Sequence, residues 1–177
     1  MIRVLLPLLL AAGLALAPGA ALAQIQVTPA TAPVLGTTIR GSSVTVFSIS
    51  TTGVVTRLSG NGIRMSSASV TVPTISFNCG LLNLSGLCAL RQLRVTIIPL
   101  AGSGPASIVK LRVGGLTGTT YVGGSPPPEG TSVTFDVNAL GLLSTASFQL
   151  GMDVQLAANA TPTGLQSFAY QVTVTML

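Results

Sequence analysis

The sequence predicts an all-β protein: a single immunoglobulin-like antiparallel β-sandwich that follows a cleaved signal peptide. After residue 40, apolar and polar residues alternate with a period of two, and no helical repeat of 3.6 is present. Thr and Val fill these segments, and branched side chains suit a pleated surface. Gly, Pro, Ser and Thr interrupt the segments at short intervals, which is typical of a sandwich or barrel. We assign residues 37–177 to one β-sandwich domain.

The first 23 residues are predicted to be a secretory signal peptide. Arg3 supplies the positive charge, residues 4–17 form the apolar core, and Pro18 interrupts it. Ala21 and Ala23 are small residues at the positions that a signal peptidase reads, so cleavage is expected after Ala23. An uncleaved membrane anchor is the rival interpretation, because about 20 apolar residues can span a bilayer. Cleavage would send the protein to the periplasm, the cell surface or the extracellular space.

Residues 24–36 form a distinct N-terminal segment. Ile25 and Val27 alternate with polar residues, and Pro29 and Pro33 then prevent pairing in a central position. The segment is therefore either a first edge strand or an extension offered to a neighbouring subunit. In the second case Ile25 and Val27 are the candidate donor strand.

The strands are expected at short spacing along the domain. Residues 42–50 alternate with a change of inward face at Val46 and Phe47, which a β-bulge would explain. Thr51, Thr52 and Gly53 then form a turn into a second strand, so the two make a hairpin. Further strands are expected at residues 69–78, with Pro73 at an edge or bulge, and at 92–98, 107–113, 131–137 and 148–156. Residues 138–146 could form a helical turn or a loop.

The last strand is predicted to be an integral part of the sandwich. Five apolar residues alternate with polar ones over residues 166–176, and burying each side chain stabilises the fold by roughly 1.5–3 kcal/mol. We expect the core-facing set to be Phe168, Tyr170, Val172, Val174 and Met176.

Two cysteines, Cys79 and Cys88, are expected to form a disulfide in an exported protein. The loop between them is short, so its stabilisation is modest, roughly 2.5–3 kcal/mol in the chain-entropy model. Metal binding is the rival interpretation, but the chain has no His to complete a site. No metal site and no cofactor is predicted.

Composition argues against nucleic-acid binding and against catalysis. Eight basic residues are scattered along the chain, which has no Trp and two Tyr, whereas a nucleic-acid site needs clustered cations and aromatic residues. The acids are Glu129 in a Pro-rich loop and Asp136 and Asp153, which both face outward on predicted strands and could meet as cross-strand neighbours. Without His, only Lys110 could serve a nucleophilic Ser as a base. We therefore predict no catalytic residue and no enzyme activity.

Two stretches carry a resemblance to a known family. "LGTTIRGSSVTVFSISTTGVVTRLSGNGIRM" and "ASFQLGMDVQLAANATPTGLQSFAYQVTVTM" resemble the opening and the ending of a bacterial secreted pilin-like or spore-coat-like β-sandwich domain family of unknown function. The resemblance spans roughly residues 34–176. The chain departs from the pattern in its cysteine-closed loop and in the Thr-rich strand at residues 69–78. What the resemblance implies is a pilin-like surface subunit.

These observations predict a non-enzymatic, secreted structural or adhesive subunit of the bacterial envelope or of an extracellular fibre. Its partners would be further copies of itself or other surface subunits, with a periplasmic chaperone as a candidate during assembly. One alternative is a monomeric module that binds a glycan or another envelope component, for which Tyr121 is the loop residue that could stack on a sugar. A small outer-membrane β-barrel is a further alternative.

Overall fold

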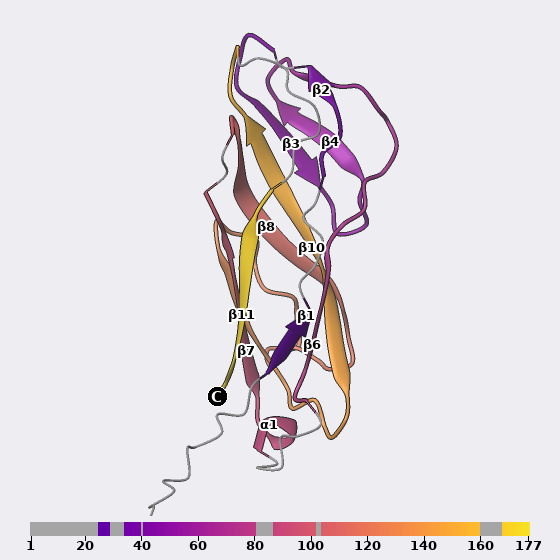
Figure 1. Cartoon of the computed structure of the whole chain (residues 1–177), viewed down its shortest axis with the longest axis vertical. Coiled ribbons are helices and arrows are strands. Elements are labelled where there is room, and N and C mark those ends of the chain that lie inside the picture. Colours follow the sequence, from indigo (N-terminus) through magenta and orange to yellow (C-terminus); the bar gives the residue numbers. More distant parts are fainter. Residues whose placement is uncertain (1–24, 29–33, 40, 81–86, 102–103, 160–167) are drawn as a thin grey trace, which may run out of the picture.

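Two antiparallel β-sheets run along the length of the molecule, which is elongated in the direction of its strands (Figure 1). In this computed structural model the described residues are 25–28, 34–39, 41–80, 87–101, 104–159 and 168–177. The predicted signal peptide and its cleavage site after Ala23 lie outside these residues. The all-β sandwich expected from the sequence is confirmed.

The larger sheet is built around one long central strand, β10 (Thr145–Leu156). One side of β10 pairs first with β6 (Thr74–Asn78) and then with β3 (Thr45–Ile49), and its other side pairs with β8 (Ala106–Thr117). β1 (Gln26–Thr28) extends the sheet beyond β6, and β4 (Val55–Ser59) extends it beyond β3. Residues 150–154 of β10 are all buried, because both edges and both faces of the strand are covered there.

The smaller sheet has the order β11–β7–β9, formed by β11 (Tyr170–Met176), β7 (Leu93–Pro99) and β9 (Val133–Val137). A two-stranded sheet of β2 (Thr38–Ile39) and β5 (Ile63–Arg64) lies at one end of the molecule, and the single-turn α1 (Leu87–Leu90) lies at the opposite end (Figure 1). Among the described residues no helix is long and apolar enough to cross a membrane.

The core lies between the inner faces of the two sheets. Phe135 of β9 meets Phe148 of β10 edge to face, with ring centroids 5.5 Å apart, and Phe77 of β6 lies 6.3 Å from Phe148. The alternate residues of β7, β9 and β10 that face this layer are fully or almost fully buried. The period of two in the sequence therefore marks the faces that join the sheets.

The predicted hairpin is present, and so is the β-bulge. The register between β3 and β4 shifts between Val46 and Phe47. The inward face does not change there, however, because Thr45, Phe47 and Ile49 are all buried on one side. In the turn, Gly53 has φ +85°, and a Cβ at this position would lie 2.1 Å from a backbone oxygen. Residues 138–144 form a loop, and α1 is too short to have produced a helical period in the sequence.

The two ends of the domain lie at the edges of the sheets. Phe168 is 2 % exposed, but Tyr170, Val172, Val174 and Met176 are only partly buried against the core, because β11 is the last strand of its sheet. All five side chains expected to face the core lie on its side of the segment, and Phe168 alone among them is fully buried. At the other edge, β1 pairs with β6 of the same chain, and Ile25 and Val27 pack against the core. β1 also lies beside β11, so the two edges meet at a seam.

Candidate functional site

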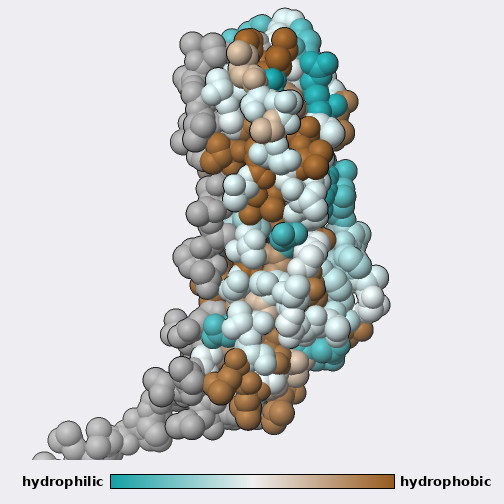
Figure 2. Space-filling view, turned by 90° about the vertical axis from the view of Figure 1, so that its right-hand side faces the viewer, coloured by the Kyte–Doolittle hydropathy of each residue, from teal (hydrophilic) through white to brown (hydrophobic). Residues whose placement is uncertain are grey.

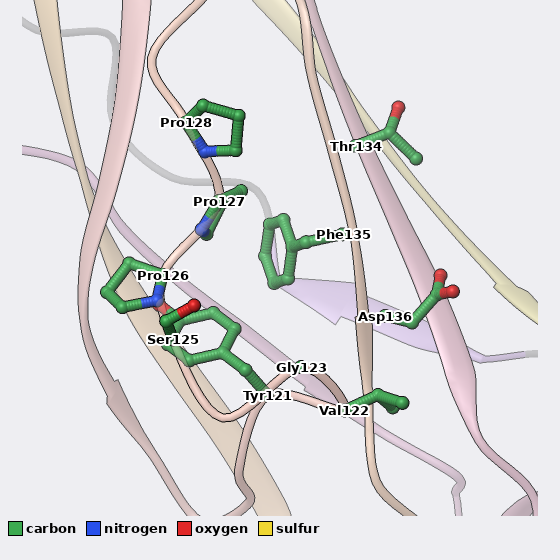
Figure 3. Close-up of a pocket in the computed structure, with 10 residues that line it drawn as sticks. All are labelled: Tyr121, Val122, Gly123, Ser125, Pro126, Pro127, Pro128, Thr134, Phe135 and Asp136. Atoms are coloured by element: carbon green, nitrogen blue, oxygen red, sulfur yellow. The ribbon is translucent and has the colours of Figure 1, made fainter.

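The loop between β8 and β9 lines an open pocket of about 300 Å³ together with β9. Its walls are the side chains of Tyr121 and Phe135 on one side and the segment Pro126–Pro128 on the other. In Figure 3 both aromatic rings face the prolines, whereas the side chains of Thr134 and Asp136 point away from them. Apolar rings and polar groups therefore both line the pocket.

Tyr121 is poorly placed to stack on a sugar. Its ring packs edge to face on Phe135, with centroids 5.6 Å apart. Its hydroxyl is buried without a hydrogen-bond partner among the described residues, and this burial raises the pKa of Tyr121 above its usual value. A stacking residue must offer an open ring face to its ligand. The geometry thus gives the glycan-binding alternative no support beyond the pocket itself.

A charged cluster on the outer face of the larger sheet holds the same loop in place. At its centre is Arg112 of β8, whose Nε donates to Glu129 at 2.8 Å and whose Nη2 donates to Asp153 and to the second oxygen of Glu129. Nη1 donates to the hydroxyl of Ser48 at 2.7 Å and to the carbonyl of Ile49 at 3.0 Å. All five N–H groups of the guanidinium are therefore used. Burial would lower the pKa of Arg112, but these carboxylates outweigh it and raise the pKa.

The centre of the cluster is buried because the sheet leaves room for Arg112. A Cβ on Gly151 of β10 would lie 2.8 Å from Cγ of Arg112, so the absence of a side chain lets the arginine lie across the strand. Asp153 is only 3 % exposed beneath it. Lys110 adds a second cation, with Nζ 3.7 Å from Glu129 and 3.9 Å from Asp153. Glu129 sits in the Pro-rich loop, so these ion pairs tie that loop to β8 and β10.

Asp136 and Asp153 do not meet as cross-strand neighbours. Asp136 lies on β9 of the smaller sheet, where both of its oxygens accept hydrogen bonds from Arg94 at 2.8 and 2.9 Å. These bonds hold the pKa of Asp136 below its usual value. Asp153, expected to face solvent, is buried on β10. Each of the three acidic side chains is thus paired with a basic side chain, and these ion pairs hold the Pro-rich loop and the strands in position.

The predicted disulfide is confirmed. Cys79 at the end of β6 is bonded to Cys88 in α1, with Cα atoms 5.7 Å apart, and both residues are buried. The bond ties α1 to the end of the larger sheet. It therefore fixes the position of one tip of the molecule.

One edge of β11 has no paired strand among the described residues, although β1 lies close to it, and we call it the free edge. The N–H of Leu100 donates to the carbonyl of Ala169, and the N–H of Leu177 donates to the carbonyl of Gln92. These two bonds show which residues of β11 direct their backbone groups toward β7. By antiparallel alternation, backbone groups of Gln171, Thr173 and Thr175 face β7. Backbone groups on the opposite side have no backbone partner among the described residues, and they belong to Tyr170, Val172, Val174 and Met176.

The outer edges of β8 and β9 are covered by the chain itself. Gly130 exchanges backbone hydrogen bonds with Leu111 on the outer edge of β8, at 2.7 and 3.1 Å. Residues 120–122 run beside β9, where Val122 donates to Asp136 and Asn138 donates to Thr120. The loop that carries the pocket therefore closes one side of the sandwich, opposite the seam between β1 and β11.

Comparison with family models, with curated proteins and with solved structures found no match. The resemblance to a pilin-like family therefore stays a hypothesis. Sequence reasoning also missed the Arg112 cluster, although one signal was present. Lys110 and Arg112 are two residues apart on one strand, as are Gly151 and Asp153 on another, so each pair shares a face of its strand.

Proposed function

We propose that this protein is a non-enzymatic structural or adhesive subunit, exported to the envelope or to an extracellular fibre, that assembles with further copies of itself. The observation that carries the proposal is the free edge of β11. This strand pairs with β7 over seven residues without a bulge, and its outward-facing backbone groups offer a regular row of donors and acceptors. A second strand can add to such an edge through main-chain hydrogen bonds.

In soluble proteins, the edge strands of β-sheets are usually protected against pairing with another chain by charges, prolines, bulges or a covering loop. β11 has no charged residue and no proline, and its exposed face carries only Gln171, Thr173 and Thr175. The edges of β8 and β9 are covered by Gly130 and by residues 120–122. The contrast with β8 and β9 supports a role for β11 in pairing with a neighbour.

The test is a charge placed on the exposed face of β11. In Thr173→Lys the new side chain points to solvent, so the core is unchanged, but two such strands brought together would place like charges close to each other. We expect the disulfide-bonded mature protein to form concentration-dependent assemblies in sedimentation velocity, and Thr173→Lys to remain a folded monomer. Thr134→Lys is the matched control, an exposed threonine on the covered strand β9, and it should assemble normally. A mature protein that stays monomeric at every concentration contradicts the proposal.

The N-terminal segment offers a second route to assembly. β1 contributes only three residues to its pairing with β6, and Ile25 and Val27 are partly buried at the seam beside β11. A segment exchanged between neighbours would carry these two side chains into the next subunit. Deleting residues 24–34 separates the routes: assembly is lost if the segment is donated, and it persists if β11 edges pair directly.

A further inference from the structure

Three leucines stand out from one end of the molecule, and together we call them the leucine tip. Leu90 of α1 is 78 % exposed, and Leu142 and Leu143 of the loop between β9 and β10 are 77 % and 79 % exposed. The two segments are joined by a hydrogen bond of 3.0 Å from the N–H of Gly141 to the carbonyl of Ala89. Figure 2 shows hydrophobic side chains gathered at the lower end, where Figure 1 places α1.

The disulfide and buried neighbouring residues hold the leucine tip in place. Cys88 is buried and bonded to Cys79, and Ala89 and Leu140 are 5 % exposed beneath the three leucines. Leu143 adopts φ +60°, a left-handed conformation that is strained for a residue with a Cβ. The local fold thus holds the three leucine side chains in solvent, although turning them inward would remove apolar surface from water. Exposed apolar groups of this kind mark surfaces that meet a membrane or a protein.

The charges around the tip favour an anionic surface. Arg91 follows α1 directly and is exposed. None of the three acidic residues lies in the tip, and each is paired with Arg94, Lys110 or Arg112. A second copy of this chain, with a formal net charge of +5, would bring further positive charge towards Arg91. Anionic lipid headgroups attract such a residue instead.

The shape of the tip points in the same direction. The three leucines come from two short segments and project outward, so a protein partner would need a cavity that matches their arrangement. The acyl region of a bilayer accepts aliphatic side chains in any arrangement, and binding grows with the apolar area inserted and with attraction to anionic lipids. We propose that the leucine tip inserts into the interface of a lipid bilayer that carries anionic headgroups, with Arg91 at the level of the headgroups.

Because the chain has no Trp, a single introduced Trp reports on insertion. Leu142→Trp in the disulfide-bonded mature protein should shift its emission to the blue with phosphatidylcholine–phosphatidylglycerol vesicles and be quenched by brominated acyl chains. Met65→Trp is the matched control, because Met65 is a 61 % exposed apolar residue beside β5, at the opposite end of the molecule. We expect no change in its emission. Quenching of both probes, or of neither, contradicts the proposal.

A second test measures vesicle binding by protein that carries no introduced Trp. Replacing Leu142 and Leu143 by Ser should weaken co-sedimentation with the same vesicles, on the order of tenfold for each leucine removed. Ile63→Ser with Met65→Ser should leave binding unchanged. Arg91→Gln should reduce binding to anionic vesicles and leave any binding to pure phosphatidylcholine unaltered. If the Leu142→Trp emission shifts with protein concentration in the absence of vesicles, the tip docks on a second copy and the lipid proposal is wrong.

Discussion

Replacing Arg112 by Met should destabilise the fold strongly, although the residue lies on the outer face of a sheet. The change keeps most of the apolar stem and removes five hydrogen bonds, leaving Asp153 buried at 3 % exposure. Removing one partner of a buried ion pair costs about 3–5 kcal/mol, because the remaining charge is uncompensated. Lys110 still lies 3.9 Å from Asp153, so we expect about 3 kcal/mol. That is a large part of the 5–15 kcal/mol typical of a whole domain.

The assay is urea unfolding of the mature, disulfide-bonded protein, followed by circular dichroism and extrapolated to zero denaturant. Arg94→Met is the matched control, because Arg94 also binds an aspartate through two hydrogen bonds but on an exposed surface. Exposed pairs contribute little, so its midpoint should move far less. The double variant Arg112→Met/Asp153→Leu removes the buried charge as well and should recover most of the loss. The reasoning is refuted if Arg112→Met unfolds at the same urea concentration as Arg94→Met, or if the double variant is no more stable than Arg112→Met.

Three further predictions follow from the edge strand and from the disulfide. Burial raises the pKa of Tyr170 to about 12, above the value of about 10 in an unfolded chain, so the stability that depends on a neutral phenol is present below pH 10 and is lost between pH 10 and 12. Absorbance titration at 295 nm should show this late step, and Tyr170→Phe should abolish it. Val172→Asp should prevent secretion of folded protein, because its side chain packs on the core, whereas Thr173→Asp should be tolerated; equal yields would contradict the assigned faces. Replacing Cys79 and Cys88 together by Ser should lower the free energy of unfolding by about 2.5 kcal/mol, and an unchanged urea midpoint would show that the bond restrains little.

The sequence predicted the sheets well where one face of a strand is buried and the other is solvated. The alternation in residues 145–156 and 170–176 identified both strands, and the register shift at Val46 and Phe47 appears where the pattern changes. The degree of burial was not predictable. Alternation shows which side of a strand is apolar, but it does not show whether the strand is central, as β10 is, or at an edge, as β11 is.

The charged cluster illustrates a second limit. Arg112, Glu129 and Asp153 come from three separate segments, and only the pairing of β8 with β10 and of Gly130 with Leu111 brings them together. A period of two places Arg112 and Asp153 on the outer face of the sheet, but it gives no information on whether another segment covers that face. The solvent-facing position assigned to Asp153 was therefore wrong, because Arg112 and the Pro-rich loop lie over it. The leucine tip escaped notice for a related reason, since a run such as Leu142–Leu143 looks the same in a sequence whether buried or exposed.

Amide hydrogen exchange on β11 tests most directly whether this strand pairs with a neighbour. The N–H groups of Val172 and Val174 face the free edge, whereas that of Thr173 faces β7 and serves as an internal reference. At concentrations where the protein is monomeric, the two edge amides should exchange quickly while Thr173 is protected. On assembly, Val172 and Val174 should become protected together and Thr173 should change little. Rapid exchange of both edge amides in the assembled protein would contradict the proposed role of β11.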